Sequence, residues 1–235
     1  MNVIIHGEDA RLQTLARRLQ SAEGDAQARL GRFREIHLCP IPTRALPDLP
    51  REGSEGRLLV GYDLPDGCER VARAVIDLGR DERFLEENAR LTALGTVGYL
   101  LTHNARALCD LSVGVIGYGR IGRRLVRYLS YLGARVTVYS SRTVAVPRGV
   151  RTVEVIWSAP PDATAYANLD VLINTAPTPF LKTAVAPEVL DLSSGIQIPA
   201  HVPHTKLPSL PARLYHESAG YTCYRAIVRN LMNTR

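Results

Sequence analysis

The fold of this chain is decided by one stretch, Val113-Gly-Val-Ile-Gly117-Tyr-Gly119-Arg-Ile-Gly122-Arg-Arg-Leu125. It places Gly-Xaa-Gly-Xaa-Xaa-Gly directly after an apolar strand and at the opening of a helix, which is the arrangement of a dinucleotide-binding βαβ unit. Gly117 permits the tight turn, Gly119 lets the backbone approach a pyrophosphate, and Gly122 lets the helix pack closely on the strand. The helix N-terminus offers N–H groups and a positive dipole end to the phosphates. The predicted cofactor-binding residues of this turn are Gly117, Tyr118, Gly119, Arg120, Ile121 and Gly122, and the alternative is a glycine-rich turn without a ligand.

The end of the next predicted strand bears on which dinucleotide binds. An NAD site usually carries Asp or Glu about 20 residues after the glycines, where the carboxylate accepts hydrogen bonds from the ribose hydroxyls. Here the strand at 136–139 runs into Ser140, Ser141 and Arg142, without a carboxylate. Two hydroxyls and a guanidinium suit the 2′-phosphate of NADP, so we predict NADP, or NAD, as the cofactor and these three residues as part of its site. The alternative is an exposed loop in a chain rich in arginine.

Short apolar runs alternate with amphipathic ones on both sides of this unit. Strands are expected at 113–116, 136–139, 152–156, 171–174 and 189–192, which predicts an α/β fold with a doubly wound, mostly parallel Rossmann sheet. Strands at 3–5, 36–39 and 58–61, with helices at 9–22, 68–78 and 81–108, predict a second, smaller α/β lobe. A Pro-rich surface loop is expected at 40–50 and a last helix at about 218–232.

The expected division of the chain follows from this alternation. Residues 1–86 are predicted to form an N-terminal α/β substrate lobe, and 87–108 an interlobe helix. Residues 109–214 are predicted to form the Rossmann NAD(P)-binding domain, and 215–235 a C-terminal helix that packs back on the N-terminal lobe. We also expect a homo-oligomer.

Composition limits the class of protein. The 235 residues are 46% hydrophobic and 22% charged, which is typical of a globular protein and excludes disordered or fibrous chains. No apolar run approaches the roughly 20 residues that cross a bilayer, and the N-terminus lacks the layout of a signal peptide, so we expect a cytoplasmic protein without membrane contact. The four cysteines are scattered without a Cys-Xaa-Xaa-Cys pair, so they are interpreted as reduced packing residues, and no metal site is expected.

The basic charge has two interpretations. Net charge is +6, and all but two of the 29 basic residues are arginines. They are spread along the chain without a dense basic run or an RNA-binding aromatic motif, so nucleic acid is not an expected partner. The arginine excess either reflects a GC-rich genome or attracts anionic ligands such as dinucleotides and dicarboxylates.

Separated short motifs follow one another along most of the chain. Besides the glycine turn they are Gly7-Glu-Asp9-Ala-Arg11, Pro40-Ile-Pro42, Asn88-Ala-Arg-Leu-Thr92-Ala-Leu-Gly95, Leu132-Gly-Ala134, Asn174-Thr-Ala-Pro177, Asp191-Leu-Ser-Ser194, Leu207-Pro-Ser-Leu-Pro211 and Ser218-Ala-Gly220. Their order and spacing resemble the A subunit of dipicolinate synthase. The resemblance implies a two-lobed oxidoreductase of sporulating bacteria, which uses a nicotinamide cofactor to oxidise a dihydrodipicolinate-type intermediate of the lysine pathway to dipicolinate. The partner that it implies is a flavoprotein, the B subunit.

The resemblance nominates further site residues. It places Asn174, Thr175, Ala176 and Pro177 at the cofactor, and Asp9, Arg11, Asn88, Thr92, Ser194 and Ser218 at the small dicarboxylate substrate. Arg11 is the main candidate for binding a substrate carboxylate. By residue type alone, Asp9 is equally a helix cap and Arg11 a solvated helix residue, while Asn88 and Thr92 are equally packing groups inside a helix.

The oxidation that the resemblance implies depends more on the orientation of the substrate than on a strong base. Forming an aromatic pyridine removes a hydride and a proton, and the gain of aromaticity supplies much of the driving force; the site must hold a dicarboxylate against the nicotinamide. Among His201, His204 and His216, one is a candidate proton shuttle, and His216 is included in the predicted catalytic set. His201 and His204 lack a carboxylate or thiolate nearby that would complete a metal site.

Departures from the family pattern keep other functions open. Leu91 stands where the family has Pro, Leu94 where it has Glu, Gly195 where a Lys is usual, and His216 where it has Pro. The alternatives are a D-2-hydroxyacid dehydrogenase-like enzyme with another substrate, and a regulatory subunit that binds a dinucleotide without catalysis.

Overall fold

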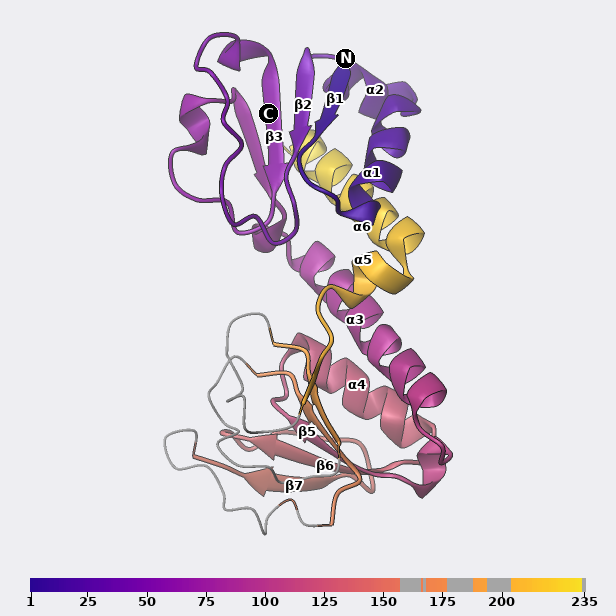
Figure 1. Ribbon diagram of the computed structural model, residues 1–235. Helices are drawn as coiled ribbons and strands as arrows, with labels where there is room; N and C mark the ends of the chain where they lie inside the picture. Colours follow the sequence, from indigo (N-terminus) through magenta and orange to yellow (C-terminus); the bar gives the residue numbers. More distant parts are fainter. Residues whose placement is uncertain (157–165, 167, 177–187, 194–203, 234–235) are drawn as a thin grey trace. The chain divides into compact units, whose positions relative to one another are not determined.

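A computed structural model gives the structure of residues 1–156, 166, 168–176, 188–193 and 204–233 (Figure 1). The chain divides into two units by its internal contacts. The first unit is Met1–Asn88 together with Pro211–Arg235, and the second is Ala89–Leu210. Helix α3 (Glu82–His103) begins in the first unit and continues into the second.

The described residues of the first unit form a parallel sheet in the order β1-β2-β3-β4. Its strands are β1 (Asn2–Ile5), β2 (Glu35–Leu38), β3 (Arg57–Gly61) and β4 (Ala74–Asp77). Its helices are α1 (Ala10–Gln20), α2 (Gly24–Leu30) and α6 (His216–Asn233), with the short α5 (Leu210–Leu214) leading into the last. Helix α6 packs on α1 and α2, so the end of the chain belongs to the first unit (Figure 1).

The strands of this sheet separate apolar from polar side chains by their period of two. Ile36 and Leu38 of β2, with Leu58 and Val60 of β3, enter the core that α1 and α6 cover. The residues between them, including Glu35, His37 and Arg57, point to the other face of the sheet. One face therefore carries the main hydrophobic core, and the opposite face carries these polar side chains next to a smaller apolar cluster around Leu59.

The described residues of the second unit form a six-stranded parallel sheet in the order β10-β9-β8-β5-β6-β7. Its strands are β5 (Ser112–Ile116), β6 (Arg135–Ser140), β7 (Arg151–Glu154), β8 (Val171–Asn174), β9 (Glu188–Asp191) and β10 (Thr205–Lys206). Helix α4 (Arg120–Tyr131) connects β5 to β6 and packs on both. The chain reverses its direction of winding between β5 and β8, which confirms the predicted doubly wound Rossmann sheet with a second α/β unit.

The predicted helix at 68–78 is wrong. Cys68–Arg70 is a single 3-10 turn, and Ala74–Asp77 forms strand β4. The apolar residues of this segment fit a helical spacing, but Ala74 and Ile76 lie opposite Leu58 and Val60 in a parallel pair with β3. Pairing with a buried neighbouring strand outweighed local periodicity.

Two smaller differences concern helix ends. Helix α3 ends at His103 rather than 108, where a separate 3-10 turn covers Leu108–Asp110. The sequence patterns did not predict helix α2.

Within the described part of the chain, no helix has the length and apolar character needed to cross a membrane.

Asp81 joins the start of α3 to α6 inside the first unit. Its carboxylate accepts hydrogen bonds from the Phe84 N–H at 2.9 Å, from Arg229 Nη2 at 2.6 Å and from Asn230 Nδ2 at 3.0 Å. The Asp81 side chain is 7% exposed. Burial alone would raise the pKa of this carboxyl, but these donors outweigh burial and hold the pKa below its ordinary value of 3.8.

We expect Asp81→Asn to lower the free energy of unfolding of the first unit by about 1.5–3 kcal/mol, the scale of a hydrogen bond to a charged group. Because the folded pKa is lowered, the contribution is present above the ordinary pKa and is lost as pH falls through the folded pKa. Chemical unfolding at several pH values measures it. Glu217→Gln, which removes an exposed pair with Arg17, is the control and should leave stability unchanged. If the difference in unfolding free energy between wild type and Asp81→Asn stayed constant into strong acid, this pH dependence would be contradicted.

Candidate functional site

The turn after β5 requires glycine for steric reasons that the structure makes explicit. Gly117 has φ +90°, in the left-handed region, and its N–H donates to the Tyr139 carbonyl at 2.9 Å. A Cβ on Gly117 would lie 2.9 Å from Thr175 Oγ1, so both conformation and space exclude a side chain. The turn therefore lies directly against the end of β8.

Gly122 and Gly119 differ in the space that a Cβ atom would have. A Cβ on Gly122 would lie 2.3 Å from the Gly117 carbonyl oxygen, because α4 approaches the end of β5 that closely. Among the residues that the structure describes, a Cβ on Gly119 would meet no atom within 4 Å. Gly119 is the N-cap of α4 and makes no side-chain capping bond, so no side chain of the cap residue covers the N-terminus of α4. The turn thus combines a tight helix contact with an open approach to backbone donors, which suits a phosphate group.

The end of β8 completes the edge of the site. Thr175 Oγ1 donates to the Ile116 carbonyl at 2.8 Å, which ties β8 to β5 beside the glycine turn. Asn174 accepts from the Ala176 N–H at 3.1 Å and donates to Asp191 Oδ1 at 3.1 Å. The structure thus brings Asn174, Thr175 and Ala176 to the glycine turn, while Pro177 lies outside the described residues.

The residues after β6 leave an exposed basic group. Ser140 is buried, and its Oγ accepts from the Arg142 N–H at 3.3 Å. The side chains of Ser141 and Arg142 are exposed. Tyr118 donates its hydroxyl to the Ala145 carbonyl at 3.0 Å, which holds the segment after β6 next to the glycine turn. Arg120 and Ile121 occupy the first turn of α4.

Asp9 and Arg11 of the first unit bind one another. Asp9 is the N-cap of α1 and accepts from the Arg11 N–H, which confirms its interpretation as a helix cap. Arg11 is only 3% exposed, so the alternative interpretation as a solvated helix residue is wrong. Its guanidinium donates to Asp9 at 2.9 Å and to the Ile41 carbonyl at 2.9 Å. Its predicted role as carboxylate anchor stays a prediction.

The other predicted substrate residues lie on two helices. Asn88 and Thr92 are one turn apart on α3, and Thr92 is buried. His216 and Ser218 are exposed at the start of α6. The first turns of α6 and α1 lie close together, since a Cβ on Gly220 would be 2.7 Å from the Arg11 carbonyl oxygen. Ser194, Gly195 and His201 lie outside the described residues.

The sequence patterns did not single out the residues that fill the polar face of the first sheet. His6 directly follows β1 and binds His37 of β2 at 2.9 Å. A histidine directly before Gly7, at the carboxyl end of the first strand, was the available signal. The part of the chain that the structure describes contains no group of His, Cys, Asp or Glu that would hold a metal ion.

This fold and turn define a class of protein. A chain with a glycine turn at the switch point of a doubly wound parallel sheet and with a second parallel α/β unit has a two-unit α/β architecture of the Rossmann type. The chain is similar to the A chain of dipicolinate synthase from Bacillus subtilis, with a TM-score of 0.72, 18% identity and coverage of 99% of this chain and 96% of that one. It is also similar to the same protein from Bacillus halodurans, with a TM-score of 0.70, 18% identity and coverage of 98% and 97%.

A dehydrogenase shares the architecture. D-lactate dehydrogenase of Escherichia coli has a TM-score of 0.54 at 16% identity, with coverage of 99% of this chain and 96% of that one. No family model and no curated protein sequence matches the chain. The likeness to these solved structures shows the fold alone.

We expect the two glycines of the turn to differ in their effect on stability. Gly122→Ala forces a methyl group against the Gly117 carbonyl and should cost about 1–3 kcal/mol of unfolding free energy. Gly119→Val points into open space and should cost less than about 1 kcal/mol, the scale of an altered N-cap. Thermal and chemical unfolding of both variants measure this order. Equal losses, or a larger loss for Gly119→Val, would contradict the geometry.

Proposed function

We propose that this protein is an NAD(P)-dependent oxidoreductase that binds its dinucleotide at the turn from Gly117 to Gly122. The observation that carries this proposal is the contrast between Gly122, closed against backbone, and Gly119, open at the N-terminus of α4. A purely structural turn needs the first feature but not the second. The N–H groups of the turn and of α4 would bind the pyrophosphate.

The residues after β6 favour NADP over NAD. Ser141 and Arg142 are exposed beyond the strand end at which an NAD site usually presents a carboxylate. A guanidinium and a hydroxyl are donors, so they suit the adenosine 2′-phosphate. The bound nicotinamide would accept a hydride, and this chain's own residues would bind and orient the substrate.

We further propose a cyclic dicarboxylate as the substrate, oxidised in a dipicolinate synthase-like reaction of the lysine pathway. Support comes from the fold shared over nearly the whole chain and from the ordered motifs that resemble the A subunit of dipicolinate synthase. On this proposal the protein acts in the cytoplasm of a sporulating cell as a homo-oligomer, and its partner is a flavoprotein.

Residues of the first unit would supply the substrate contacts. His216 and Ser218 are exposed at the start of α6, close to the Asp9–Arg11 pair at the start of α1. A hydroxyl and an imidazole there can donate to a carboxylate. Because Arg11 already binds Asp9 and the Ile41 carbonyl, it would reach a substrate carboxylate only by exchanging one of these partners.

Arg142→Ala is expected to weaken NADP binding by about 1.5–3 kcal/mol and to leave NAD binding nearly unchanged, because only NADP carries the 2′-phosphate. Titration calorimetry with both cofactors measures the difference. Arg127→Ala, at an exposed position on α4, is the matched control and should change neither affinity. Equal losses for both cofactors in Arg142→Ala would remove the assignment.

With NADP and freshly generated hydroxy-tetrahydrodipicolinate, the full chain, alone or with a flavoprotein partner, should release dipicolinate and reduced cofactor. Mass spectrometry of the product and absorbance of the reduced nicotinamide measure the two together. Gly119→Val should bind no cofactor while it stays folded, because its side chain fills the space of the phosphates. Bound NADP without any dipicolinate would instead favour a changed substrate or a non-catalytic protein that binds a dinucleotide.

A further inference from the structure

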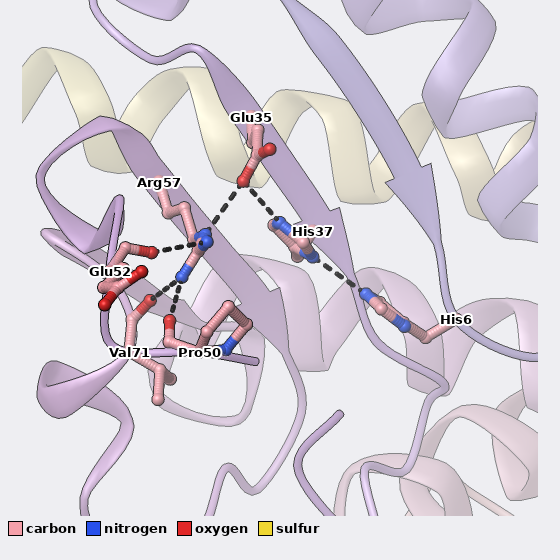
Figure 2. A network of polar contacts seen from close by, with 7 residues as sticks. All are labelled: His6, Glu35, His37, Pro50, Glu52, Arg57 and Val71. Carbon is pink, nitrogen blue, oxygen red and sulfur yellow. Dashed lines mark hydrogen bonds and ion pairs between the residues drawn. The ribbon is translucent and has the colours of Figure 1, made fainter. Parts of the chain in front are cut away.

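A chain of polar side chains crosses the face of the first sheet that lies opposite α1 and α6 (Figure 2). Glu35 of β2 accepts from Arg57 Nε of β3 at 2.8 Å. The Arg57 guanidinium also donates to the carbonyls of Pro50, Glu52 and Val71, so it cannot swing away without breaking the surrounding loops. Hydrogen bonds from Arg57, and then from His37, lower the pKa of the Glu35 carboxyl. Glu35 is therefore an ionised acceptor at neutral pH.

His37 extends this chain towards the end of β1. Its Nε2 lies 3.3 Å from Glu35 Oε2, and its Nδ1 lies 2.9 Å from His6 Nε2. The planes of the two imidazoles differ by 14° and the ring centroids lie 5.2 Å apart, so the rings are nearly parallel (Figure 2). His37 is 3% exposed, which shields the central link from water. The four side chains form a continuous path from Arg57 to His6.

The carboxylate at one end determines the tautomers along the path. An ionised Glu35 can only accept, so His37 carries its proton on Nε2 and, when neutral, presents a lone pair on Nδ1. That lone pair accepts the Nε2 proton of a neutral His6. His6 therefore carries its own lone pair on Nδ1, which makes no hydrogen bond within the described residues. Burial, then the neighbouring His37, lowers the pKa of His6, so this ring is neutral at neutral pH.

The open nitrogen lies at the edge where α/β sheets bind ligands. His6 directly follows β1, its N–H donates to the Leu38 carbonyl at the end of β2, and it is followed by Gly7 in a left-handed conformation. Open parallel sheets bind ligands outside the carboxyl ends of their strands. The same turn leads to Asp9, the cap of α1.

We propose that His6 is a catalytic residue that takes the substrate proton on Nδ1, and that His37 and Glu35 position its ring. This inference rests on the proposed oxidoreductase function. Oxidation of a dihydro ring removes a hydride, which carries two electrons to the nicotinamide dinucleotide, and leaves one proton on the substrate. That proton passes to His6 Nδ1. The Nε2 proton of His6 can then move to His37 and the His37 proton to Glu35, which is 37% exposed and can release it to water.

A weak base suits this chemistry. Because aromatisation drives the loss of the proton, a neutral imidazole with a lowered pKa is a sufficient acceptor, and the imidazolium that forms is neutralised through the path to Glu35. The starting tautomers return when His6 Nδ1 releases its proton to water and a proton moves back along the path from Glu35. If the path only stabilises the loops that Arg57 binds, then the imidazole of His6, at the far end of the path, would not be needed for turnover. A catalytic role and a purely structural role of the path therefore predict different effects on turnover when His6 alone is replaced.

The first test measures turnover in full-length variants with NADP and the cyclic dicarboxylate. His6→Ala should lower kcat about 100-fold or more, the scale of general base catalysis, while the NADP Kd stays within about two-fold. Added imidazole should restore part of kcat in His6→Ala. His103→Ala removes an exposed histidine of α3 that stacks on Tyr99, and it is the matched control with unchanged kcat. A His6→Ala variant that folds, binds NADP and turns over like wild type would overturn the proposal.

The second test needs no turnover. In the full-length protein labelled with nitrogen-15, His6 should show an unprotonated Nδ1, and pyridine-2,6-dicarboxylate should move the His6 signals but not those of His103. A protonated Nδ1 at neutral pH, or unmoved His6 signals at saturating dicarboxylate, would overturn the role of His6. Wild type that binds NADP without turnover would contradict the proposed function separately, and these spectra would then decide on His6 by themselves.

Discussion

The close approach of α4 to the end of β5 is the constraint on which the second unit depends. A single methyl group on Gly122 would lie 2.3 Å from the Gly117 carbonyl oxygen, so the helix can start where it does only without a side chain there. That start directs the first N–H groups of α4 over the turn, and the hydroxyl of Thr175 closes the opposite edge through the Ile116 carbonyl. No described atom lies within 4 Å of a Cβ built on Gly119, so the described part of the chain leaves room there for a phosphate to approach backbone donors.

In the first unit, one face of the sheet packs the hydrophobic core and the other face carries the polar side chains. Side chains such as Leu38 and Val60 pack under α1 and α6, and the salt bridge between Asp81 and Arg229 ties α6 to the start of α3. Of the alternate residues on the other face, Leu59 packs with Cys39 and Cys68, while Glu35, His37 and Arg57 are polar. These polar residues carry the path from Glu35 to His6, so a polar network coexists with a continuous core in a small sheet.

Much of the fold could be predicted, because its signals lie close together in sequence. The strands on both sides of the glycine turn, the carboxylate cap of Asp9 and the hydroxyl-rich end of β6 each depend on neighbours a few residues away. The incorrect predictions concern segments whose structure depends on contacts with residues far away in the sequence. The local pattern predicts a helix at β4, because the pairing of β4 with β3 has no signature inside the segment. It also leaves a solvated position open for Arg11, because the Ile41 carbonyl that binds this side chain lies 30 residues away.

The sequence by itself determined the glycine turn between β5 and α4, since glycine spacing, strand and helix follow one another without a gap and steric limits act between near neighbours. Only the tertiary structure decided the setting of His6. Its partner His37 is 31 residues away, and the two meet because parallel pairing of β1 with β2 fixes which residues lie side by side. The lone pair on His6 follows in turn from Glu35 and Arg57, whose pairing joins two more strands. Hydrogen-bond direction along such a path depends on register, which no local stretch of sequence encodes.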